Sequence, residues 1–433
     1  MKSFNQIIFG IILIGVSLFS CVKEDTCTLT CAADEVLSID CNCVKINSSN
    51  VVTVASNITS NTTWTKSKEY HLAARVVVTN GATLTIEAGT VIKGEAGSGA
   101  NATALIIARG GKIMANGTAA EPIIFTTVAD QITTGQIESP NMDATQNGLW
   151  GGVLILGKAP ISASGNAESV QIEGIPASDI NGLYGGSDPA DNSGVFTYVS
   201  IRHGGANIGE GNEINGLTLG GVGSGTKIEN VEIVSNQDDG IEIFGGTVNV
   251  NNIIIWNASD DQIDCDQAYA GTLDNFIAIL GSGSDHGLEL DGGEGTANAT
   301  FTLSHGTLKG KGANVSTDGE YADLRDKVQC NLNSIYFFNF SPNSDLELDN
   351  PGVSDNWANG KIVFSNLEFN VSQLTSGNNT LEAIFKDDGG RDAEFNTACQ
   401  SFAKIVTTHT QGADVSKFKN WTVTDKKGIL ADF

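Results

Sequence analysis

Short hydrophobic segments separated by polar, glycine-rich turns run through most of this 433-residue chain. In the middle of the chain these segments share a pattern in which two apolar residues flank an acidic one, as in Ile241-Glu242-Ile243, Ile263-Asp264-Cys265 and Leu288-Glu289-Leu290. Because successive residues of a strand face opposite sides, the apolar residues should fill a core while the acidic residue faces water. The acidic residues are 22 and 25 residues apart, which indicates one turn of a solenoid rather than a hairpin repeat.

A second repeated position has the same period. Asn230, Asn252 and Asn275 each precede a hydrophobic segment, at spacings of 22 and 23 residues. Asparagine tolerates a left-handed backbone and can hydrogen-bond to an asparagine stacked above or below it. Two columns with one shared period predict stacked coils. We therefore predict an all-β fold, a right-handed parallel β-helix with capped ends.

The pattern divides the chain into four parts. Residues 1–20 combine Lys2 with a short apolar run and lead into Leu18-Phe19-Ser20-Cys21, which resembles a bacterial lipobox and predicts a signal peptide followed by acylation of Cys21. We expect residues 21–50 to form a lipidated, cysteine-rich tether and residues 51–385 to form the β-helix. Residues 386–433 are predicted to be a C-terminal cap that prevents end-to-end growth of the sheets.

Four cysteines cluster in the predicted tether, at Cys27, Cys31, Cys41 and Cys43. In an exported chain an oxidising compartment favours disulfides, although the spacing is also compatible with zinc. We expect two disulfides and leave their connectivity open. Cys265, by contrast, has the inward parity of its strand and is expected to be a small core residue.

The net charge of −26 changes the picture of possible partners. It argues against nucleic acid and anionic membrane surfaces, both of which would repel the chain. Neighbouring strands lie about 4.8 Å apart, so stacked carboxylates repel each other by roughly 3 to 4 kcal/mol at an effective dielectric near 20. Bound cations, shared protons or basic groups can relieve this repulsion, and calcium accepts several carboxylate oxygens. The candidate calcium ligands are Asp238, Asp239, Glu242, Asp260, Asp261, Asp264, Asp285 and Glu289.

Three phrases carry a resemblance to a known group. Residues 84–94 ("LTIEAGTVIKG"), 122–127 ("PIIFTT") and 236–250 ("NQDDGIEIFGGTVNV") resemble the coils of right-handed parallel β-helix proteins that are common among Bacteroidota surface lipoproteins. The likeness covers most of residues 60–290. It implies an outer-membrane lipoprotein that is anchored to lipid through Cys21 and exposed at the cell surface.

A second, partial resemblance concerns chemistry. Asn236-x-Asp238, Asp260-Asp261, Asp285-His286-Gly287 and Arg325-x-Lys327 resemble, in order, the four motifs of polygalacturonases, with Asp285 in place of the family's glycine. The resemblance implies that Asp260 or Asp261 is the acid, that Asp238 belongs to the base pair, and that His286 joins their proton network. It also implies that Arg325 and Lys327 bind a uronic carboxylate.

From these features we expect a surface lipoprotein that binds extracellular polysaccharide or another envelope component, with calcium on the acidic ladder and Trp256 as a platform for a sugar ring. An inverting glycoside hydrolase is one alternative and requires carboxyl groups about 6.5 to 9.5 Å apart, with the two basic residues converging on them. A structural or adhesive rod is another, and it requires no cleft. The irregular stretches 132–146 and 175–192 would wall a cleft if they emerge on the acidic face.

Overall fold

The computed structural model describes residues 35–37, 43–45 and 50–433, apart from residues 174, 176–177, 209–212 and 316–318. The chain forms two compact units, Met1–Ser49 and Asn50–Phe433. In the first unit, β1 (Glu35–Leu37) and β2 (Cys43–Lys45) pair antiparallel. The predicted signal peptide, the lipidation site Cys21, the cysteines Cys27, Cys31 and Cys41, and the side chain of Cys43 lie outside the described residues. Among the described helices, none is long and apolar enough to cross a membrane.

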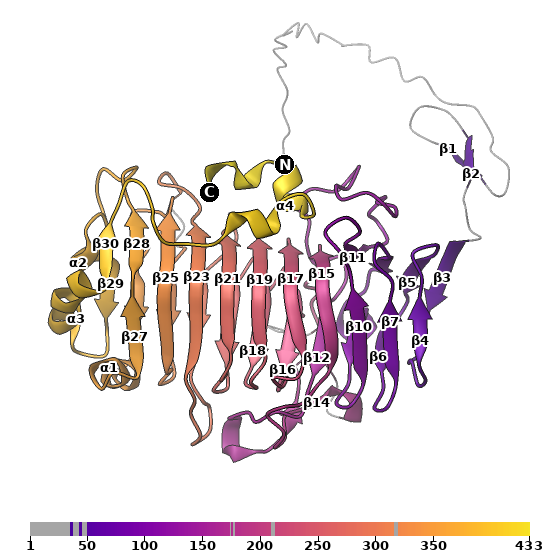
Figure 1. Cartoon of the computed structure of the whole chain (residues 1–433), viewed down its shortest axis with the longest axis horizontal. Helices are drawn as coiled ribbons and strands as arrows, with labels where there is room; N and C mark the ends of the chain where they lie inside the picture. The colour runs from indigo at the N-terminus through magenta and orange to yellow at the C-terminus, as the bar shows by residue number, and fades with distance from the viewer. Residues whose placement is uncertain are drawn as a thin grey trace, which may run out of the picture. The chain divides into compact units, whose positions relative to one another are not determined.

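The second unit is a parallel β-helix, as predicted (Figure 1). Its coils contribute strands to a 16-stranded sheet, called here the large sheet, and to a 10-stranded sheet, called here the small sheet. The large sheet contains β3 (Val51–Val54), β4 (Thr62–Trp64), β5 (Glu69–Leu72), β7 (Thr83–Ile86), β8 (Val91–Gly94), β10 (Lys112–Asn116), β11 (Ile123–Thr127), β15 (Gly194–Arg202), β17 (Lys227–Val234), β19 (Asn249–Trp256), β21 (Thr272–Ile279), β23 (Phe301–Lys309), β25 (Cys330–Phe338), β27 (Ile362–Ser365), β28 (Leu367–Asn370) and β30 (Ala403–Ile405). The small sheet contains β6 (Arg75–Val78), β9 (Ala104–Ile107), β12 (Val153–Leu156), β16 (Leu217–Gly220), β18 (Ile241–Phe244), β20 (Ile263–Asp266), β22 (Leu288–Leu290), β24 (Ala322–Leu324), β26 (Leu346–Leu348) and β29 (Phe385–Asp387).

The long strands of the large sheet bend at a column of left-handed residues. The first half of β15 pairs with β10 and its second half with β11, and β25 divides in the same way between β27 and β28. Asn230, Asn252 and Asn275 lie at these bends with φ of 56°, 55° and 57°. Asn275 Nδ2 donates a hydrogen bond of 2.6 Å to Asn252 Oδ1. The asparagine column is therefore present. It divides β17, β19 and β21 each into two segments, which pair with their neighbours on either side of the bend.

The core is the space that the coils enclose. Ile241 pairs with Ile263, and Ile263 with Leu288, and all three side chains are fully buried. Cys265 is a free thiol in the same core, as its parity predicted. Burying one such aliphatic side chain contributes about 1.5 to 3 kcal/mol, and the gain repeats in every coil.

The C-terminal part does more than cap one end. The coils continue past residue 385 through β29 and β30, where α1 (Pro351–Ala358), α2 (Leu381–Ile384) and α3 (Asp392–Ala398) lie at the end of the solenoid (Figure 1). Residues 406–433, called here the C-terminal strap, then return along the large sheet and include α4 (Val423–Lys426). The prediction of a cap over residues 386–433 is thus replaced by two structures. The sequence pattern did not show the return, because it assigns outward residues to solvent.

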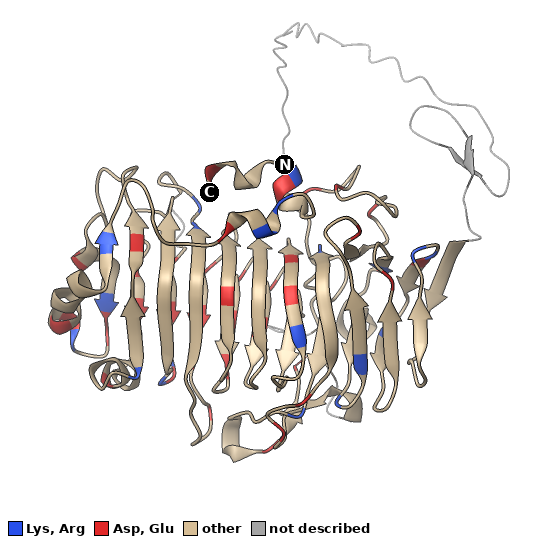
Figure 2. Cartoon of the chain, viewed as in Figure 1, with Lys and Arg blue, Asp and Glu red and all other residues tan. Residues whose placement is uncertain are grey.

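Apolar packing and two buried carboxylates hold the strap. Phe418 and Trp421 pack on Ile254 and Ile277, which point outward from the large sheet. Lys, Arg, Asp and Glu occur on only some strands of the large sheet in this view (Figure 2). Glu232 Oε1 accepts hydrogen bonds from the Thr424 backbone N–H and hydroxyl, at 2.9 and 2.8 Å. The strap thus covers apolar surface that strands alone leave exposed.

Glu368 anchors the start of the strap. Its carboxylate accepts hydrogen bonds from Thr410 and from the Gln411 backbone N–H, and it pairs with Lys404 at 3.0 Å. Burial alone would raise the pKa of Glu368, but these donors lower it to about 2. The native carboxylate therefore stays ionised well below neutral pH.

Replacing Glu368 with Gln should lower the free energy of unfolding by about 1.5 to 3 kcal/mol at pH 7, the range for hydrogen bonds to a charged group. Because the native pKa lies below the unfolded value near 4.3, this contribution is present above about pH 4.3 and is lost as pH falls toward 2. Denaturant unfolding at pH 7 and pH 3 measures both effects. Lys404→Met is the control, because it removes an exposed partner worth less than about 1 kcal/mol. Equal losses in the two variants would contradict the assigned role.

Candidate functional site

The outward carboxylates of the small sheet form a single row, called here the acidic column. Strand register aligns Glu242 with Asp264, Asp264 with Glu289, Glu289 with Asp323, and Asp323 with Glu347. Sequence reasoning missed Asp323, although Ala322-Asp323-Leu324 repeats the same alternation. Ala322 is less hydrophobic than the residues at the equivalent positions, and the stretch before it is irregular, so the repeat was not recognised there. With Asp323 included, every coil from β18 to β26 contributes one carboxylate.

The same row is apolar at its other end. It begins with Val77, Ile106 and Leu154 and reaches Glu242 through Thr218. An insertion of residues 158–190, containing β13 (Val170–Gln171) and β14 (Leu183–Tyr184), covers the apolar part, where Tyr184, Ile106 and Leu154 belong to one buried cluster. The insertion, which includes the irregular stretch 175–192, thus lies on the face of the acidic column. Residues 132–146 contact the large sheet instead, because Ala144 accepts hydrogen bonds from Ser235 and Asn257.

The first members of the acidic column do not face water as the alternation predicted. Glu242 and Asp264 are each only 7% exposed, whereas Glu289 and Glu347 are partly exposed. Neighbouring segments cover the first two coils. Asn215 donates its side-chain N–H to Glu242, and the Tyr184 hydroxyl donates to Gln267 at the end of β20. Strand periodicity identifies the outer face correctly, but it does not reveal what folds over that face.

Burial and mutual repulsion raise the pKa values of these carboxyl groups. Burial is the largest cause for Asp239, Glu242 and Asp264, and neighbouring carboxylates add to it, so all three pKa values lie well above the ordinary range. The same two causes raise the pKa to about 6 for Asp323, about 7 for Asp238 and about 8 for Glu347. The face therefore holds more negative charge than it can stabilise by itself.

Asp239, Glu242 and Asp264 form the most buried carboxylate group of this face and are called here the buried triad. Their oxygen atoms can lie within 4.8 Å of one another. Asp264 Oδ1 is buried and has no hydrogen-bond partner among the described residues. A second group, Asp238, Asp239 and Asp260, brings oxygen atoms within the same distance at a more exposed position. These geometries suit a cation bound by oxygen ligands.

His286 neutralises the next part of the face. Its Nδ1 lies 2.8 Å from Asp261 Oδ1 and 3.2 Å from Glu289 Oε2, and its Nε2 lies 3.9 Å from Glu320. Burial alone would lower the pKa of His286, but the hydrogen bond and charge of Asp261, with the other carboxylates, raise it to about 9. The ring is therefore a cation at neutral pH. It serves as an internal counter-ion and is a poor proton acceptor.

Arg325 is held by the same face. Its Nε and Nη2 donate to the two oxygens of Asp291 at 3.1 and 2.9 Å, and Nη2 also pairs with Glu289. Lys327 is exposed and its side chain lies against Gly352 at the start of α1. No ion pair among the described residues joins Lys327 to a carboxylate. The structure therefore does not bring Arg325 and Lys327 together as a clamp.

The remaining predicted residues are dispersed. Asp260 and Asp285 occupy equivalent places in successive coils, and the Asp285 backbone N–H donates to the Asp260 carbonyl at 2.9 Å, but both side chains are exposed. Asn236 is buried and donates to the Ile214 carbonyl, which gives it a structural role. Trp256 is partly buried against the strap cluster on the large sheet, away from the small sheet that carries the acidic column. Trp256 therefore packs with apolar residues of the strap cluster and is not a platform for a sugar ring beside the acidic column.

The sequence model of a family described as "Pectate-lyase like beta helix domain" matches residues 56–424. The chain belongs to this pectate-lyase-like β-helix family. No curated protein and no solved structure matches the chain. The matched range includes the acidic column, the insertion and most of the C-terminal strap, so these parts belong to the pectate-lyase-like domain itself.

The raised pKa values predict how the stability of this pectate-lyase-like domain depends on pH. An acid whose pKa is higher in the folded state destabilises the fold as it ionises, so the metal-free free energy of unfolding should fall between about pH 4 and pH 8. Asp264→Asn should raise it by about 1 to 3 kcal/mol at pH 8 in chelator, because it removes an unpartnered buried charge. Denaturant unfolding at pH 5 and pH 8 tests both statements.

Glu229→Gln on the large sheet is the control for this experiment, because Glu229 is paired with Lys227 and lies outside the acidic column. A stability profile that rises with pH over this range, or destabilisation by Asp264→Asn at pH 8, would contradict the prediction.

Proposed function

We propose that this chain is an outer-membrane lipoprotein, anchored through Cys21 and displayed at the cell surface, that binds extracellular glycan on a face braced by calcium. The observation that carries the proposal is the buried triad of Asp239, Glu242 and Asp264. Its oxygens approach within 4.8 Å, and one Asp264 oxygen has no partner in the described part of the chain. Buried charges of one sign require a counter-charge or protons.

The protein supplies counter-charges only to part of the face. His286 and Arg325 pair with Asp261, Glu289 and Asp291. No lysine, arginine or histidine among the described residues forms an ion pair with any member of the buried triad. A bound cation would complete the pattern that His286 and Arg325 begin in the neighbouring coils.

Calcium fits this group better than other common ions. All three side chains offer oxygen, which hard cations prefer, and the group contains no thiolate or imidazole. Calcium also accepts irregular geometry and many ligands, whereas magnesium requires a near-ideal octahedron. Asn215, which donates to Glu242, adds a buried carbonyl oxygen with no hydrogen-bond partner among the described residues.

Glycan is the ligand class that fits both the family and the charge of the face. The family's description names a pectate-lyase-like domain, and pectate is an acidic polysaccharide. An anionic polysaccharide would be repelled by the bare acidic column, but a calcium ion at the more exposed group of Asp238, Asp239 and Asp260 can bridge its carboxylates to those of the protein. This arrangement supports calcium-dependent binding without requiring a proton donor and acceptor.

A hydrolase is the second candidate, because the pKa of Asp238, raised by burial and by Glu173 and Asp260 to about 7, suits a proton donor at neutral pH. Three observations favour binding. Oxygens of Asp238 and Asp260 approach within 4.8 Å, closer than the roughly 6.5 to 9.5 Å of inverting pairs. His286 is already a cation, and Arg325 is already bound by Asp291. A structural rod offers no reason to bury carboxylates that lower stability.

Calcium binding is tested by calorimetric titration of the full chain. We expect Asp264→Asn and Glu242→Gln each to weaken calcium binding at least about tenfold, because each removes one charged ligand. Saturating calcium should raise the free energy of unfolding of the unmodified chain by about 2.7 kcal/mol at 100 times Kd. Glu229→Gln should bind calcium normally. The same calcium affinity in Asp264→Asn as in the unmodified chain would refute the site.

Glycan binding is tested by incubating the full chain with polygalacturonate and a panel of neutral and acidic polysaccharides, with calcium or with chelator. We expect retention of acidic polysaccharide in calcium, loss of retention in chelator, and no new reducing ends. Reducing ends that appear with the unmodified chain without an unsaturated uronate at the other new end, and that disappear with Asp260→Asn, would establish the hydrolase instead.

A further inference from the structure

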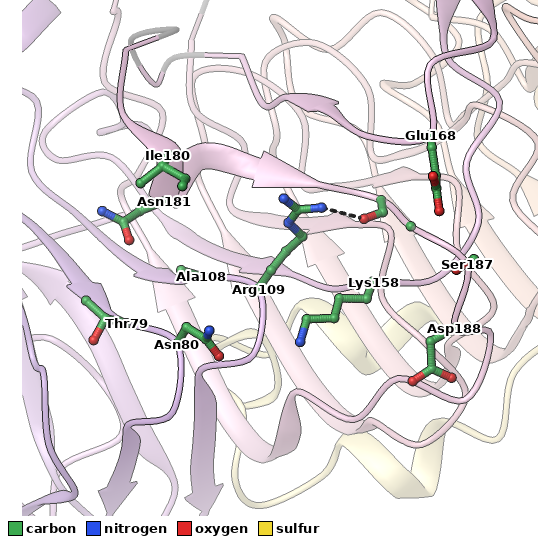
Figure 3. A pocket seen from close by; sticks show the side chains of 12 residues that line it. Thr79, Asn80, Ala108, Arg109, Lys158, Glu168, Ile180, Asn181, Ser187 and Asp188 are labelled. Atoms are coloured by element: carbon green, nitrogen blue, oxygen red, sulfur yellow. Dashed lines mark hydrogen bonds between the residues drawn. The ribbon is translucent and has the colours of Figure 1, made fainter.

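A cavity of about 560 Å³ lies where three coils of the small sheet turn toward the large sheet (Figure 3). The turns after β6, β9 and β12 contribute Asn80, Arg109 and Lys158, and the insertion closes the other side. The volume falls within the range of about 300 to 1,000 Å³ for small-molecule sites. No residue of the acidic column lines this cavity.

Two cations reach into the cavity in a chain whose net charge is −26. Neither Arg109 nor Lys158 forms an ion pair with a carboxylate of the described residues. Arg109 Nη1 donates to the Gly185 carbonyl at 3.0 Å, which holds the guanidinium in place while other N–H groups remain for a ligand (Figure 3). Two such donors in one cavity form an anion-binding end.

At this end of the cavity the side chains of Asn80 and Lys158 lie directly against the backbone of Gly110. A Cβ there would lie 2.2 Å from Asn80 Oδ1 and 3.1 Å from Lys158 Nζ, so both side chains end above this glycine. Its φ of 82° also favours glycine. The missing side chain at residue 110 therefore lets Asn80 and Lys158 approach the backbone closely at this end of the cavity.

The opposite side of the cavity carries carboxylates. Glu168 and Asp188 line it away from the Lys158 ammonium (Figure 3), and Asp188 Oδ1 accepts the Ala190 backbone N–H at 3.1 Å. Carboxylates accept hydrogen bonds from hydroxyl groups but repel a second anion. The cavity therefore suits a ligand with one anionic group at one end and hydroxyl groups at the other.

We infer that this cavity binds one acidic sugar residue, with its carboxylate or sulfate on Arg109 and Lys158 and its hydroxyls on Glu168 and Asp188. The site extends the proposed glycan binding to a second place on the solenoid and does not depend on calcium. The insertion would then have two roles, because one side of it closes this cavity and Tyr184 on it packs against Phe244 of β18.

The inference is tested by calorimetric titration of the full chain in chelator, which removes calcium from the acidic column. The probes are trigalacturonic acid, a sulfated trisaccharide and neutral maltotriose. We expect an acidic probe to bind at least about tenfold more tightly than maltotriose, since hydrogen bonds to charged groups are worth about this factor or more. The carboxylated and sulfated probes identify which anionic group the cavity accepts.

Arg109→Ala and Lys158→Ala should each weaken binding of the acidic probe at least about tenfold, and Arg109→Lys should have an intermediate effect because it keeps the charge without the planar fork. Lys112→Ala, at the exposed start of β10, is the charge-matched control and should bind normally. Melting temperatures establish that each variant is folded.

Each other outcome overturns the inference. Equal affinity for maltotriose would remove the role of the cations, and unchanged affinity in both alanine variants would place the ligand elsewhere. Binding that occurs only in calcium would assign the acidic sugar to the acidic column, so the proposed function would survive without this cavity. Conversely, Asp264→Asn should leave binding in chelator unchanged.

Discussion

Parallel register is the constraint on which the rest of this structure depends. Each coil places its residues directly on those of the coil before, at a separation of about 4.8 Å. Stacked apolar residues such as Ile241, Ile263 and Leu288 gain burial from this repetition. Stacked carboxylates repel each other for the same reason. The solenoid thus repeats in every coil both the gain from apolar burial and the cost of carboxylate repulsion.

The outward row of the small sheet shows how the protein covers repeated apolar residues and reduces the repulsion between repeated carboxylates. The row begins with Val77, Ile106 and Leu154, which the insertion covers. It then becomes acidic, and His286 and Arg325 neutralise the central coils. Three different solutions, namely a cover, a proposed bound cation and internal cations, follow one another along the row. The place where protein cations do not reach is the place where a ligand has most to contribute.

Much of the fold could be predicted from the sequence, because period and parity are local properties. The inward residues, the asparagine column and the stacking of Glu242, Asp264 and Glu289 follow from spacing and strand alternation. The burial of these carboxylates does not follow from spacing or alternation. Val231-Glu232-Ile233 and Ile241-Glu242-Ile243 have the same pattern, yet Glu232 accepts hydrogen bonds from the strap residue Thr424 while Glu242 lies in the buried triad. What covers an outward residue is decided by segments far away in the chain, which a local pattern does not contain.

The same distinction explains the polygalacturonase-like motifs. A solenoid that repeats acidic residues at one position produces short acidic motifs in sequence order, because every coil supplies one. Order along the chain does not specify the partners that each side chain finds. Arg325 follows His286 as the resemblance requires, but Asp291 and Glu289 already occupy its guanidinium, and Lys327 lies against Gly352. In a fold of this kind, catalytic assignment therefore has to rest on unpaired groups in space. By that criterion the buried triad and the cavity at Arg109 and Lys158 are stronger candidates for ligand sites than the motif that first suggested chemistry.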